Sequence, residues 1–86
     1  MKAHIRVYMK YFDYAVQEEI MCEACHRRAV YIHHINGRQN NDIKNLIALC
    51  RTCHDRTHSS KDYVSKEEFQ LIHGYFLTGQ RKQFLS

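Results

Sequence analysis

The sequence lacks proline, low-complexity tracts and linker-like segments, so nothing in its composition marks a boundary between domains. We therefore predict a single domain over residues 1–86. Long apolar runs are also lacking, because His4, Arg6 and Lys10 interrupt the first stretch. We expect neither a signal-peptide core, which needs about 7–15 apolar residues, nor a membrane span. The resulting expectation is a cytoplasmic protein with reduced thiols and no membrane partner.

Large size and strong charge are absent too. The chain has 86 residues, and domains below roughly 70–80 residues often add a metal or disulfides to a small hydrophobic core. Its formal net charge is +4, which suits an acidic partner such as nucleic acid but by itself indicates only non-specific association. The composition therefore leaves the question of function to the motifs.

The four cysteines occur in two Cys-x-x-Cys-His segments, residues 22–26 and 50–54. Such segments can form disulfides, attach haem, or provide the two halves of one metal site. Reduced thiols argue against disulfides, and haem attachment accompanies export, for which no signal is visible. Zinc takes four thiolates in a tetrahedron, and the 24 residues between the pairs slightly exceed the usual spacing of about 15–20. We predict one structural zinc ion, held by Cys22, Cys25, Cys50 and Cys53.

Sequence periodicity predicts a helix towards each end of the chain. Apolar residues recur at helical spacing over about residues 4–16, although an alternating subset of them would also fit a strand. Ser65 and Glu68 match a capping box and Gly79 supplies a stop, so we predict a second helix over about residues 66–78.

The segment between these helices mixes strand and loop signals. Val30, Tyr31 and Ile32 favour a strand, and residues 36–42 are a loop by composition. Residues 45–49 form a short apolar run that leads into the second cysteine pair, and we interpret residues 51–58 as one short helix.

Four histidines fall within 26 residues in this segment. His33 and His34 are adjacent, so on a strand they point to opposite sides. His54 and His58 are four positions apart, so on a helix they share one face, a spacing that suits two ligands of one metal. Their arrangement beside the predicted zinc site indicates a second functional site.

The order His33-His34-Ile35, Asn45-Leu46, Cys50-x-x-Cys53-His54 and His58 resembles the HNH endonucleases. The resemblance spans about residues 22–58, and the subgroup with two Cys-x-x-Cys pairs is common among bacterial and phage proteins. It implies an α+β fold, with a small zinc-stapled ββα-metal (His-Me finger) core flanked by the two terminal helices. Many members have a proline soon after the histidine doublet, whereas this chain has Asn36-Gly37, which leaves the loop geometry open.

The resemblance also implies a role for each matching residue. His34 would be the general base, and Asn45 would bond backbone groups across the loop and orient that base. His33, His54 and His58 would hold a catalytic divalent cation, which is Mg²⁺, Mn²⁺, Ni²⁺ or Zn²⁺. The implied reaction is hydrolysis of DNA phosphodiester bonds, by nicking or double-strand cutting, that leaves 5′-phosphate and 3′-hydroxyl ends.

Arginines are the candidates for holding the DNA backbone. Arg51 and Arg56 fall in the predicted short helix, and Arg38 lies in the loop. Phosphate contacts carry no sequence information, so we expect DNA as the partner with little sequence specificity. A homodimer or a larger phage or bacterial assembly is compatible with the sequence.

Two other functions stay open from the sequence. A non-catalytic zinc module that binds DNA or a protein would explain the cysteines but not the four histidines. A two-haem electron carrier would explain His26 and His54 but would leave the doublet His33-His34 and Asn45 unused.

Overall fold

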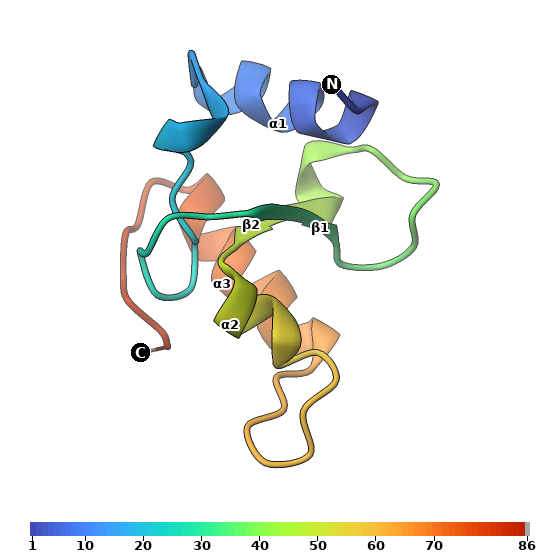
Figure 1. The fold of residues 1–86 in the computed structure, drawn as a ribbon, viewed down its shortest axis with the longest axis vertical. Helices are drawn as coiled ribbons and strands as arrows, with labels where there is room; N and C mark the ends of the chain where they lie inside the picture. Colours follow the sequence, from blue (N-terminus) through green and yellow to red (C-terminus); the bar gives the residue numbers. More distant parts are fainter. Residues whose placement is uncertain (86) are drawn as a thin grey trace.

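A short antiparallel sheet lies at the centre of the computed structural model, which describes residues 1–85 (Figure 1). Strand β1 (Tyr31–His34) pairs with strand β2 (Leu46–Leu49), and this register sets His33 opposite Ile47. The sheet and the helices around it confirm the predicted α+β class, and β1 confirms the predicted strand.

Strand β2 is buried on both faces because helices cover the sheet from two sides. Leu46 and Ala48 belong to the apolar cluster that includes Tyr8 of helix α1 (Ala3–Phe12). Ile47 and Leu49 belong to the cluster on the other side, with helix α3 (Lys66–Leu77). Alternate residues of a strand point to opposite faces, so a four-residue apolar strand serves both halves of the core.

Helix α1 ends at Phe12, four residues before the predicted end. The reason is local, because Asp13 adopts the left-handed conformation with φ 60° and its N–H bonds back to the helix. Asp tolerates this conformation better than most residues and so makes an effective helix end. The N-terminal segment, whose pattern also fitted a strand, is therefore a helix, as predicted.

Helix α3 has the boundaries that its capping residues predict. The Ser65 side chain accepts a hydrogen bond from the Glu68 N–H, and Glu68 reaches back to the N-cap backbone. Gly79 has φ +88° just beyond the helix end, which suits glycine. The helix buries Phe69, Ile72, His73 and Phe76.

The helix that follows β2 is shorter than predicted. Helix α2 (Arg51–Asp55) begins after Cys50, and beyond Asp55 the chain continues in tighter turns. The Thr57 N–H donates to the His54 carbonyl and the His58 N–H donates to the Asp55 carbonyl, which are bonds of the i→i+3 type.

Two single-turn 3₁₀ helices complete the chain, η1 (Gln17–Glu19) and η2 (Ile43–Asn45). Residues 36–42 form the predicted loop between β1 and η2. Within residues 1–85, none of the helices combines the length and apolar character that crossing a bilayer requires.

Candidate functional site

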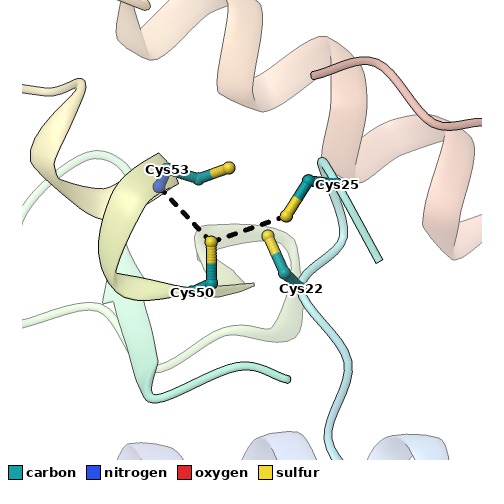
Figure 2. A group of neighbouring side chains, drawn as sticks. All are labelled: Cys22, Cys25, Cys50 and Cys53. Atoms are coloured by element: carbon teal, nitrogen blue, oxygen red, sulfur yellow. Dashed lines mark hydrogen bonds between the residues drawn. The ribbon is translucent and has the colours of Figure 1, made fainter. Parts of the chain in front are cut away.

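The four cysteines converge on one point between β2, α2 and the turn at residues 22–25 (Figure 2). All four are buried, and their sulfur atoms lie within 4.8 Å of one another. Sulfurs that share a tetrahedral zinc ion with Zn–S bonds near 2.3 Å are about 3.8 Å apart. This cysteine cluster, comprising Cys22, Cys25, Cys50 and Cys53, therefore has a size and donor set that can hold a structural metal ion.

Each cysteine pair sits on a backbone turn that aims two sulfurs inwards. In the first turn, the His26 N–H donates to the Cys22 carbonyl at 2.9 Å, and His26 has φ 68°. In the second, the Cys50 sulfur caps α2 by accepting the Cys53 N–H at 3.4 Å. Such N–H···S contacts stabilise negative charge on sulfur, which metal ligands carry.

The geometry separates the three interpretations of the repeated motif. All four cysteines are free, and the line between two sulfurs in Figure 2 joins Cys25 to Cys50 at 3.5 Å, across the two motifs. A hydrogen bond from the Cys53 thiol lowers the pKa of Cys22, which favours the thiolate form. The two motifs are halves of one cluster, which fits neither two separate haem attachments nor a disulfide within each pair.

A groove of about 540 Å³ collects the histidines that the sequence singled out. We call it the histidine groove, and its lining residues are Lys2, His4, Tyr31, Ile32, His33, His34, Arg38, His54, Thr57 and His58. They come from the start of α1, from β1 and the loop after it, and from α2 with the following turn. Segments that are distant in sequence thus form one cationic groove.

The groove follows the open edge of strand β1, which in the described part of the chain pairs only with β2. His33 faces α2 and α3, with its ring 5.1 Å from His54 and 6.3 Å from Phe69. His34 faces α1, with its ring 4.7 Å from His4. The doublet therefore points to opposite faces of the sheet, yet both side chains reach the same groove around its edge.

His33, His54 and His58 form the candidate ligand set for a second metal. Two imidazoles on one tetrahedral ion place their ring centroids about 5 Å apart. The separations here are 5.1 Å for His33–His54 and 6.5 Å for His54–His58, where the tighter turn after α2 spreads the second pair. Among residues 1–85, the cysteines are the group whose ligand atoms already converge, so the three histidines are neighbours rather than a closed ligand set.

Burial keeps the first two of these histidines neutral, which is the form that binds metals. Desolvation, followed by repulsion from the neighbouring imidazoles of His54, His34 and His58 when they are protonated, lowers the pKa of His33 to about 4. Desolvation also lowers the pKa of His54, whose ring stacks on Tyr31 at 4.2 Å. Protons therefore compete weakly for this site near neutral pH.

His34 is held by its Nε2 atom, which lies 2.8 Å from Asn41 Oδ1. An amide oxygen only accepts hydrogen bonds, so in this contact Nε2 carries a proton and donates it to Asn41. An imidazole whose second nitrogen has no partner of this kind is equipped to take a proton there.

Asn45 is 6% exposed and uses its whole side chain to hold the loop. Its Oδ1 accepts the Asn36 N–H at 2.7 Å, and its Nδ2 donates to the carbonyls of Gly37 and Asn40 at 3.0 and 2.8 Å. Gly37 has φ +94°, a conformation that suits glycine. Asn45 thus sets the conformation of the loop that carries Asn41 and Arg38.

The three candidate arginines lie in different environments. Arg38 lines the histidine groove, whereas Arg51 is exposed on α2 and is not among the lining residues. Arg56 is half-buried and pairs with Asp62 at 3.6 Å. Sequence reasoning missed Lys2 and His4, because only the packing of α1 against the sheet brings them to the groove.

No family model, curated protein or solved structure matches this chain. Its function therefore has to be inferred from its own side chains.

Proposed function

We propose that the chain is a metal-dependent endonuclease of the HNH type that hydrolyses DNA phosphodiester bonds. The observation that carries this proposal is the histidine groove, where His34, held by Asn41 through Nε2, lies together with His33 and His54. The order β1, β2, α2, with a cysteine pair before β1 and another at the start of α2, further supports a ββα-metal core.

In this proposal His34 is the general base. It accepts a proton at Nδ1 from the water that attacks phosphorus, while Asn41 keeps the ring oriented through Nε2. Asn45 contributes indirectly, because it holds the loop that carries Asn41. Breaking the P–O bond on the 3′ side leaves 5′-phosphate and 3′-hydroxyl ends.

His33, His54 and His58 would hold the divalent cation, which is Mg²⁺, Mn²⁺, Ni²⁺ or Zn²⁺. When bound, the ion supplies charge neutralisation at the phosphate oxygens. The cysteine cluster holds a structural zinc ion and fixes α2, the helix that carries His54, against β2.

Lys2 and Arg38 line the same groove and would contact DNA phosphates. Such contacts position the backbone without reading bases, so we expect low sequence specificity. Arg51 is exposed on α2 and available for a further phosphate contact outside the groove.

The test is cleavage of supercoiled plasmid with Mg²⁺, Mn²⁺, Ni²⁺ or Zn²⁺ in turn, by the wild type and by His34→Ala. Loss of a general base lowers the rate by about 10²–10⁴-fold, and we expect the zinc content and the folded spectrum to stay unchanged. Full activity in His34→Ala would refute the assignment of the base. If neither protein cleaves while both retain zinc, a non-catalytic DNA-binding module is the better description.

A further inference from the structure

A buried polar network is centred on Glu23 and His73, outside the lining of the histidine groove. Both side chains are 1% exposed, although Glu and His are rarely this buried. Glu23 lies between the cysteines of the first turn, and His73 lies on α3, fifty positions away in sequence. Neither residue takes part in the reaction proposed above, so their burial calls for another explanation.

Every hydrogen-bonding atom of the pair is occupied. His73 Nδ1 lies 2.7 Å from one Glu23 oxygen, and His73 Nε2 lies 2.6 Å from the Ile43 carbonyl. The other Glu23 oxygen accepts the Tyr8 hydroxyl at 2.5 Å and the Ala48 N–H at 3.2 Å. The network therefore joins α1, the first cysteine turn, β2, η2 and α3.

The bond to Ile43 connects this network with the groove. A backbone carbonyl only accepts hydrogen bonds, so His73 Nε2 carries a proton and donates it to the Ile43 carbonyl. Ile43 begins η2, and Asn45 ends it. Asn45 in turn holds the loop whose Asn41 bonds His34. A continuous chain of hydrogen bonds and one helical turn thus runs from Glu23 to His34.

We infer that His73, oriented by Glu23, is a positioning residue that fixes η2 and thereby Asn45 and the loop beside His34. Its catalytic consequence rests on the proposed endonuclease function, whereas its effect on Asn45 does not. The competing explanation is that the pair only stabilises the core, in which case Asn45 is indifferent to which His73 contact is lost.

Two substitutions of His73 separate these explanations, because each retains the hydrogen bond of a different ring nitrogen. The amide nitrogen of Asn can take the place of Nδ1, so His73→Asn keeps the bond to Glu23 and loses the bond to Ile43. The amide nitrogen of Gln reaches the place of Nε2, so His73→Gln keeps the bond to Ile43 and loses the bond to Glu23. The two variants have similar polarity, and each lacks one buried hydrogen bond.

The readout is hydrogen exchange of the Asn45 side-chain amide by NMR in the zinc-loaded protein. Its two protons donate to the Gly37 and Asn40 carbonyls and are protected while the loop holds. We expect protection to fall about tenfold or more in His73→Asn and to stay within about threefold of the wild type in His73→Gln. Equal protection in the two variants would overturn the inference.

Kinetics provide the second readout, on plasmid cleavage with the same variants. Displacing a base by about 1 Å costs up to 10²-fold in rate, so we expect kcat to fall at least tenfold in His73→Asn with KM within about twofold. If the wild type proves to have no nuclease activity, the proposed function fails, while the exchange measurement still decides the role of His73.

If neither variant folds, the measurement is made on the wild-type protein. A through-hydrogen-bond coupling between His73 Nε2 and the Ile43 carbonyl carbon is then the expected signal, and its absence would overturn the inference.

Tyr8→Phe serves as the matched control, because it removes a bond to the same carboxylate without touching His73. We expect Asn45 protection in Tyr8→Phe to equal that of the wild type.

Discussion

The cysteine cluster and the histidine groove are neighbouring sites built on opposite principles. The cysteines are buried, and their four sulfurs already lie within 4.8 Å of one another. The histidines are half-exposed or exposed, line a groove of about 540 Å³, and keep ring separations of 5.1 and 6.5 Å. The first site is compact and buried, and the second is open to solvent.

The short helix α2 contributes side chains to both the cysteine cluster and the histidine groove. Cys53 and His54 are adjacent on α2, so the same turn points one side chain into the cluster and the next into the groove. Structural metal sites have four protein ligands, whereas catalytic sites keep an open position. The four cysteines of the cluster fit the first pattern, and the three histidines proposed as ligands in the groove would correspond to the second.

The largest expected effect comes from breaking the closed site with Cys53→Ser. A structural zinc ion contributes about 10–16 kcal/mol of apparent binding free energy, which is comparable with the whole stability of a small domain, about 5–15 kcal/mol. We expect loss of bound zinc and loss of the folded circular-dichroism spectrum. A metal-free variant that stays folded would show that the core does not depend on the cluster.

Substituting the histidine that follows each cysteine pair, one at a time, tests whether the cysteine cluster and the histidine groove have separate roles. His54→Asn removes a groove side chain, and we expect cleavage to fall by about 10²-fold or more while zinc content stays at one ion. His26→Asn is the matched control, because Asn tolerates the left-handed φ of 68° found there. Plasmid cleavage and elemental analysis check both variants, and equal loss of activity in both would contradict the separation of the two sites.

The smallest effect is expected from Ser65→Ala, which lies outside both sites. Loss of an N-cap side chain costs about 1 kcal/mol, which lowers the Tm of a domain this small by about 4–8 °C. Thermal melts measure this change, and cleavage at 25 °C and zinc content should match the wild type. A large fall in activity would mean that modest destabilisation alone explains the effect of His54→Asn.

Much of the local structure could be predicted from the sequence because it depends on neighbouring residues. The Ser65–Glu68 capping box and Gly79 set the limits of α3, and two Cys-x-x-Cys turns indicated one metal site. Apolar patterns identified β1 and the helical character of α1, although its end at Asp13 depends on a single left-handed residue that periodicity does not reveal.

Tertiary structure decided which residues share a site. Lys2 and His4 reach the groove because α1 packs on the sheet through Tyr8 and Met9, a contact that no local pattern specifies. No sequence pattern singled out Glu23 or His73, and only the folded chain buries them together. The sequence by itself determined the turns, caps and ligand types, since these follow from short-range hydrogen bonding. The groove and the buried network followed from how the helices pack across the sheet.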